Sequence, residues 1–251
     1  VLPLRSLGFP ARKTRGTLFF PSSFSFSYSH PLISSFRFPF SLTFLFQKKK
    51  MAGMHFLIGF RTDDYVILAS DKSAFAYGAI VVSKDHDKAV KLGQKTYMEV
   101  IGESGDVSNF SDFAQRNMSL YKMRNGYELS PKTTHFWLRK HIADALRSEN
   151  YWRVDVLLGG YDDKENKAWL SSIDYLGNGI EEQNYLFRGF SGRFCYAIMD
   201  TIYHPTMSLE EGIAAVKKCI DEARGRFVAN LPNFSVMIID KDGSRILDQV
   251  L

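Results

Sequence analysis

The residue types that most often carry catalysis or bind metals are few and widely spaced in this chain. Cys195 and Cys219 are too few for a disulfide framework, and no pair of Cys or His residues has the spacing of a metal site. His135 and His141 are six positions apart, on different faces of a helix, so we expect surface or core polar roles for them. The glycine pair at residues 159–160 lacks the flanking pattern of a nucleotide-binding loop. These residues therefore indicate neither a cofactor nor a metal ion.

The composition divides the chain near residue 50. Residues 1–50 hold eight basic and no acidic side chains, with ten of the 21 Phe and five of the eight Pro residues. Residues 51–251 therefore carry 24 basic and 27 acidic side chains, a net charge of −3 where the whole chain has +5. The charge that would favour nucleic acid or an anionic membrane lies in the first 50 residues, so we expect neither partner for the remainder.

Three interpretations of residues 1–50 compete. An Arg-rich and Ser-rich segment without acidic residues has the composition of an organelle transit peptide. A membrane anchor fails on length, because residues 41–46 are far fewer than the roughly 20 apolar residues that span a bilayer. The chain begins with Val1, and organised sequence starts just after Met51. We therefore expect residues 1–50 to be a non-folding leader, of the kind that results from upstream sequence translated in frame, and residues 51–251 to form one domain.

Strand-like and helix-like segments alternate through residues 51–251. Short β-branched and aromatic runs separated by turn residues predict strands at residues 55–61, 65–71, 79–83, 88–92, 96–104, 153–161, 168–174, 185–188, 234–240 and 244–250. Apolar residues that recur at intervals of three and four predict helices at residues 106–124, 131–147, 192–203 and 209–227. Because hairpins favour antiparallel pairing, this order predicts an α+β fold, a four-layer α/β/β/α sandwich.

Two helix starts have recognisable caps. Ser130 followed by Pro131 supplies an N-cap and a proline in the first turn. Ser208 and Glu211 have the S-x-x-E spacing of a capping box. Both signals place the beginning of a helix at the next residue.

With this order of elements, residues 51–251 resemble the β-type subunits of the proteasome core particle. The resemblance rests on the order and spacing of YVILASD (65–71), IGESGD (101–106), RVDVLLGGYD (153–162), RGFSGRFCYAIMD (188–200) and SLEEGIAAVKKCI (208–220). It implies the N-terminal-nucleophile hydrolase fold. It also implies a hetero-oligomer in the cytoplasm and nucleus, in which this chain contacts other β subunits of a seven-membered ring, α-ring subunits and the opposite β ring.

The resemblance also shows what the family's chemistry would require. Catalytic members use a threonine whose hydroxyl attacks the peptide carbonyl while its own α-amine accepts the proton. The matching position here is His55, which has no hydroxyl and, because Gly53 and Met54 precede it, no free α-amine. Thr62 does not replace it, because it lies nine residues before Asp71 whereas the nucleophile position lies 16 before.

Six further positions correspond to positions of the family's active-site pattern. Three of them keep the family residue, namely Asp71, Lys88 and Gly102. The other three hold a different residue from the serine, aspartate and serine of the family, namely Phe190, Phe227 and Asn230. Losing a nucleophile, a serine and an aspartate together leaves no proton relay. We expect no catalytic residue, and we expect Asp71 and Lys88 to form a structural ion pair.

The function expected from these observations is that of a non-catalytic structural subunit, needed to assemble the proteolytic chamber in ATP- and ubiquitin-dependent protein degradation. The alternative is an active N-terminal-nucleophile hydrolase of the threonine type. Two segments are candidates for subunit interfaces, the aromatic-rich residues 121–127 and the C-terminal residues 244–251.

Overall fold

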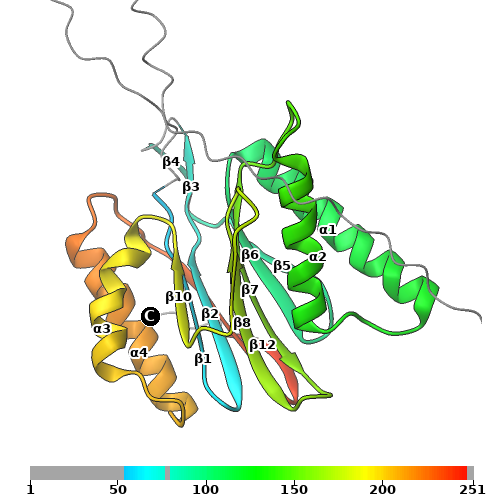
Figure 1. Ribbon diagram of the computed structural model, residues 1–251. Coiled ribbons are helices and arrows are strands. Elements are labelled where there is room, and N and C mark those ends of the chain that lie inside the picture. The colour runs from blue at the N-terminus through cyan, green and yellow to red at the C-terminus, as the bar shows by residue number, and fades with distance from the viewer. Residues whose placement is uncertain (1–53, 77–79, 248–251) are drawn as a thin grey trace, which may run out of the picture. The chain divides into compact units, whose positions relative to one another are not determined.

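A computed structural model describes residues 54–76 and 80–247 of the chain (Figure 1). The first of two five-stranded antiparallel sheets has the order β10 (Tyr185–Arg188), β1 (Leu57–Arg61), β2 (Tyr65–Asp71), β11 (Phe234–Asp240) and β12 (Gly243–Leu247). The second has the order β5 (Ala89–Lys91), β6 (Thr96–Gly102), β7 (Val154–Asp162), β8 (Lys167–Ile173) and β9 (Gly179–Glu181). A separate pair is formed by β3 (Ala74–Ala76) and β4 (Ile80–Ser83).

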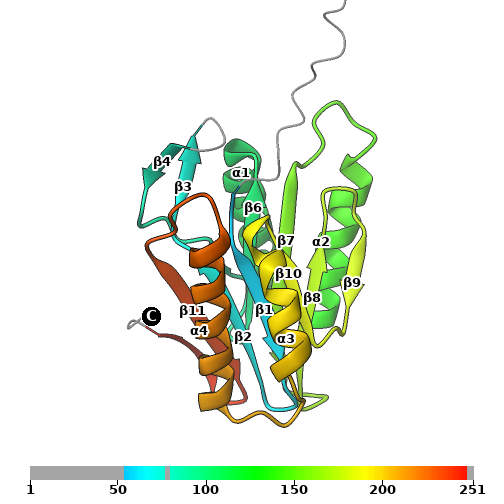
Figure 2. The ribbon, with the colours of Figure 1, turned by 90° about the vertical axis from the view of Figure 1, so that its left-hand side faces the viewer.

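The helices cover the outer faces of the two large sheets. Helices α1 (Ser104–Asn125) and α2 (Pro131–Ala145) contact the second sheet (Figure 1). Helices α3 (Tyr196–Ile202) and α4 (Leu209–Arg226) lie over the first sheet, as Figure 2 shows. The expected α+β class is therefore confirmed. No helix within the described ranges is long and apolar enough to cross a membrane.

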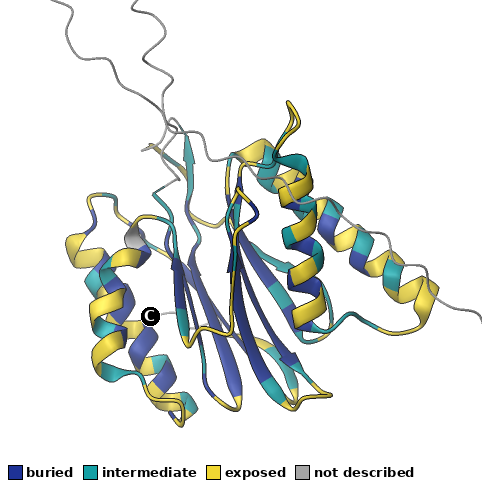
Figure 3. Ribbon diagram, viewed as in Figure 1, coloured by how far each residue is buried: buried dark blue, intermediate teal, exposed yellow. Residues whose placement is uncertain are grey.

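Buried residues form one cluster at each of the three boundaries between these layers, and Figure 3 colours them dark blue on the facing sides of the helices and sheets. Phe56 and Val216 belong to the cluster between the first sheet and α4. Leu68 and Leu157 belong to the cluster between the two sheets. Phe110 of α1 belongs to the cluster between the second sheet and helices α1 and α2. Strands of both sheets thus bury both of their faces, which explains why their sequences read as nearly continuous apolar runs.

The structure differs from the predicted elements in several places. The strand predicted at residues 96–104 ends at Gly102, and Ser104 already belongs to α1. The predicted helix at residues 192–203 begins instead as a 3-10 helix, Ser191–Cys195, that leads into α3. A Cβ on Gly192 would lie 3.0 Å from the carbonyl oxygen of Leu57, so packing against β1 sets this first turn. The sequence does not predict strands β3 and β9, because their three residues do not belong to a longer strand-like run of the kind that predicts β5. The predicted strand at residues 244–250 is described only as far as Leu247.

The first hairpin is what brings the candidate site together. Strands β1 and β2 pair with Leu57 opposite Ser70. The Oγ of Thr62 accepts a hydrogen bond from the amide of Tyr65, at 3.2 Å, and closes the turn. This register places Asp71 beside Phe56, whose carbonyl accepts a hydrogen bond from the Asp71 amide at 3.0 Å.

The predicted caps are confirmed. The Ser130 hydroxyl accepts from the Thr133 amide at 3.3 Å, with Pro131 in the first turn of α2. In α4 the Ser208 hydroxyl accepts from the Glu211 amide, and the Glu211 carboxylate accepts from the Ser208 amide at 2.8 Å. Both helices thus begin where side chains satisfy their otherwise unpaired amides.

Candidate functional site

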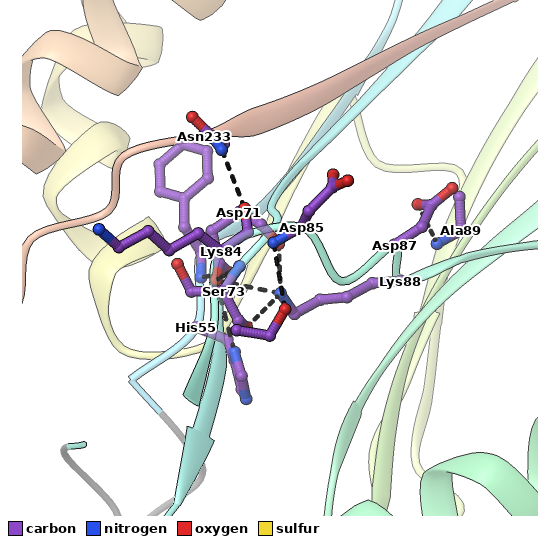
Figure 4. Close-up of polar contacts among 11 residues, drawn as sticks. His55, Asp71, Ser73, Lys84, Asp85, Asp87, Lys88, Ala89 and Asn233 are labelled. Atoms are coloured by element: carbon purple, nitrogen blue, oxygen red, sulfur yellow. Dashed lines mark hydrogen bonds and ion pairs between the residues drawn. The ribbon is translucent and has the colours of Figure 1, made fainter. Parts of the chain in front are cut away.

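Asp71 is the centre of a buried polar cluster at the end of β2 (Figure 4). Its Oδ1 accepts a hydrogen bond from the Phe56 amide at 2.8 Å. Its Oδ2 accepts from the Ser73 amide at 3.1 Å and from the Lys88 Nζ at 3.0 Å. Two main-chain donors and one cation therefore hold this carboxylate in its charged form.

Lys88 comes directly before β5 and reaches across to the end of β2. Its Nζ donates to the Asp71 carboxylate, to the Asp71 carbonyl and, at 3.0 Å, to the Ser73 carbonyl. The side chains of Lys88 and Asp71 are 3% and 0% exposed, respectively. The expected ion pair is present, and the Lys88 ammonium group donates to three oxygen atoms of the protein.

The electrostatics of the pair follow from burial and proximity. Burial by itself raises the pKa of Asp71, but the His55 ring, the Lys88 charge and the Phe56 amide outweigh it, and the pKa lies below its ordinary value. Burial lowers the pKa of Lys88 despite the opposing attraction of Asp71. The arrangement favours a charged carboxylate that is compensated inside the protein.

His55, which is expected at the family's nucleophile position, lies beside Asp71. Its Nδ1 lies 3.6 Å from the Asp71 Oδ2, and its side chain is 14% exposed. Its ring makes an edge contact with Phe75 of β3, with ring centroids 5.2 Å apart. Gly189, at φ +79°, passes so close to the His55 carbonyl that a Cβ there would lie 2.1 Å from the oxygen. The imidazole therefore lies beside an aromatic ring and a carboxylate, while the main chain of His55 packs closely against Gly189.

Phe190 and Phe227, which are expected where the family pattern has a serine and an aspartate, form an aromatic contact. The centroids of these two rings lie 6.0 Å apart, and the centroid of the Phe194 ring also lies 6.0 Å from that of Phe190. Phe227 is buried, whereas Phe190 is 45% exposed. These side chains supply neither a proton donor nor a proton acceptor, so they contribute only aromatic packing.

The remaining two positions of the expected pattern are Gly102 and Asn230. Gly102 ends β6 at φ +151°, where a Cβ would lie 2.0 Å from the carbonyl oxygen of Arg153. Close main-chain packing alone therefore accounts for glycine at this position. Asn230 is exposed in the segment between α4 and β11.

Sequence reasoning missed Glu99, which lies on β6 and is 1% exposed. Its Oε2 has no hydrogen-bond partner among the described residues. Burial raises its pKa to about 8, against smaller lowering effects of the Ser70 hydroxyl and the Lys88 charge. The available signal was a single carboxylate inside the apolar run YMEVI, but the sequence does not show that both faces of this strand are buried.

The other residues considered for chemistry have structural surroundings. Cys195 and Cys219 are buried free thiols, and the Cys195 Sγ contacts the Cys219 carbonyl oxygen at 3.4 Å. His135 is buried with its Nε2 3.3 Å from Glu181, and His141 contacts the Trp137 carbonyl. No group of three or more His, Cys, Asp or Glu residues within the described ranges has the arrangement of a metal site.

Comparison with known proteins agrees with the resemblance drawn from the motifs. The family model "Proteasome subunit" matches residues 55–239. The chain is 58% identical over 198 residues to the proteasome subunit beta type-2 of Caenorhabditis elegans, which covers 79% of this chain and 100% of that protein. It is 40% identical to the proteasome subunit beta type-4 of Saccharomyces cerevisiae, covering 78% and 98%, respectively. The chain therefore belongs to the proteasome subunit family, with β-type subunits among its relatives.

Proposed function

We propose that this chain is a non-catalytic structural subunit in the β ring of the proteasome core particle, and that it is needed to close the proteolytic chamber. The observation that carries the proposal is His55 at the nucleophile position, held between Asp71 and Phe75. An imidazole inside a polypeptide has neither the hydroxyl nor the free α-amine that the family's reaction uses. The retained Asp71 and Lys88 then serve folding, as a compensated buried pair.

The fold supports the same proposal. Two stacked antiparallel sheets between two helical layers agree with the four-layer sandwich of the N-terminal-nucleophile hydrolases. The match of the family model to residues 55–239 supports residues 51–251 as the β-type domain. We place this domain in the cytoplasm and nucleus, in a seven-membered β ring that contacts α-ring subunits and the opposite β ring.

The test of this proposal is assembly. We expect the full-length chain, expressed with an epitope tag in cells, to sediment with a very large particle and to be present in purified core particles at the stoichiometry of the other β subunits. A chain that sediments as a monomer would exclude the proposed role, because a structural ring subunit has no function outside its ring.

The alternative function, an active threonine-type hydrolase, has a chemical test. Core particles are incubated with a threonine-directed covalent inhibitor, and the intact mass of each subunit is measured. We expect adducts on the catalytic subunits, which serve as the internal control, and an unchanged mass for this chain. An adduct on this chain would establish a nucleophile that the geometry at His55 does not provide.

A further inference from the structure

A cleft of about 760 Å³ lies between the C-terminal half of α1, the β5–β6 turn and the segment that joins α1 to α2. The buried residues of α1 end at Met118, so the last two turns leave the second sheet, as Figure 1 shows. Leu120 and Met123 line the cleft on these turns and are 41% and 80% exposed. Burying such apolar side chains against a partner is favourable, so this surface is suited to a partner.

The cleft combines this apolar surface with positive charge. Lys91, Arg116 and Lys122 line it, with Glu128 as the single carboxylate. Glu128 is already compensated, because its Oε1 accepts from the Lys122 Nζ and its Oε2 from the Gln94 amide, both at 2.8 Å. Lys91 and Arg116 therefore give the cleft an excess of positive charge.

These two cations remain available to a partner. Arg116 contacts Asp112 at 3.0 Å, but both side chains are largely exposed, and such surface pairs contribute little. The Lys91 Nζ lies 5.7 Å from the centre of the Tyr97 ring, and its charge helps to lower the pKa of Glu128, whose carboxylate oxygens already accept from Lys122 and the Gln94 amide. A carboxylate that entered the cleft would find two cations beside apolar surface.

We propose that this cleft binds a segment of a neighbouring proteasome subunit that presents apolar side chains next to Asp or Glu residues. This inference rests on the proposed function and specifies one interface of the ring subunit. The first 50 residues of this chain do not fit the cleft, because they contain eight basic and no acidic residues. The charge of the cleft instead requires an acidic partner.

The direct test places a photo-cross-linking amino acid at position 123 of the full-length chain in assembled core particles. We expect a cross-link to a peptide of another subunit that contains Asp or Glu beside apolar residues. A cross-link within this chain, to a second copy of it, or to a peptide without acidic residues overturns the proposal. The absence of any cross-link, in particles that contain the chain, also overturns it and leaves the proposed function intact.

Charge reversal gives an independent readout. The double variant Lys91→Glu with Arg116→Glu should lower incorporation into particles about tenfold, because like charges then face each other in the interface. The matched control is Lys140→Glu with Arg147→Glu, two exposed residues that do not line the cleft. Equal incorporation of both double variants overturns the proposal. If the unaltered chain is missing from particles altogether, both the proposed function and this interface are wrong.

Discussion

The Nζ of Lys88 lies 3.0 Å from the Oδ2 of Asp71, and both side chains are buried. We expect a catalytic member of the family to use such a lysine and aspartate to tune its nucleophile, whereas here the side chain beside the pair is His55. The ammonium also donates to the carbonyls of Asp71 and Ser73, so it ties the end of β2 to the segment before β5. Asp71 and Lys88 thus connect the two large sheets.

Replacement of Lys88 by Met should destabilise the protein by about 3 kcal/mol or more, because the Asp71 carboxylate stays buried without its cation. Urea denaturation of the purified chain, followed by tryptophan fluorescence, measures this loss. The double variant Lys88→Met with Asp71→Asn should lose less than the single variant, and Lys140→Met, at an exposed position, should lose almost nothing. An equal loss in the single and double variants would show that the charge is not the cause.

Glu99 makes stability depend on pH. The unfolded chain releases this proton near the ordinary pKa of 4.5, whereas the folded chain keeps it to about pH 8. The folded state therefore binds one more proton between these values, so the free energy of unfolding falls as pH rises through this window and is constant above it. At about 1.4 kcal/mol per pKa unit, the effect amounts to a few kcal/mol.

The variant Glu99→Gln should remove this slope, so that it gains stability relative to the original chain between pH 5 and pH 8. Urea denaturation at a series of pH values measures the difference. Glu165→Gln, at an exposed loop position, should leave the original slope unchanged. Parallel pH profiles for Glu99→Gln and the original chain would contradict the assignment.

Gly102→Ala should be strongly destabilising, by several kcal/mol, because a Cβ would lie 2.0 Å from the Arg153 carbonyl oxygen at a main-chain φ of +151°. The matched control is Gly105→Ala in the first turn of α1, where nothing lies within 4 Å of the added carbon. Alanine is the better helix former, so the control should be neutral or stabilised by up to about 1 kcal/mol. Similar melting temperatures for the two variants would refute the packing explanation.

A threonine at position 55 should not create an active site. A chain that begins with Thr at this position would regain the hydroxyl and the α-amine, but Phe190 and Phe227, which we expect at two of the family's polar positions, supply no proton donor or acceptor. We expect no hydrolysis of fluorogenic peptides in particles whose catalytic threonines have been replaced, and no adduct with a threonine-directed inhibitor. Particles with one catalytic subunit restored are the positive control, and turnover by the His55→Thr chain alone would contradict this expectation.

Local sequence features predicted most of the elements. The β1–β2 hairpin, the Ser208 capping box and the long helices follow from turn residues, caps and periodic apolar positions, which act over a few neighbouring residues. Strands β3 and β9 escaped prediction because neither lies in a longer strand-like run, whereas the equally short β5 lies within the run at residues 88–92. The first turn before α3 differs from the prediction because contact with β1 sets its conformation.

The sequence by itself determined that position 55 has no hydroxyl and that positions 190 and 227 have no polar group, because side-chain chemistry does not depend on folding. Only the tertiary structure decided what the retained residues do. Asp71 and Lys88 become a buried pair, Glu99 acquires its raised pKa, and α1 leaves a charged apolar cleft at its end. Burial and pairing between residues distant in the chain produce these properties, and no local pattern contains them.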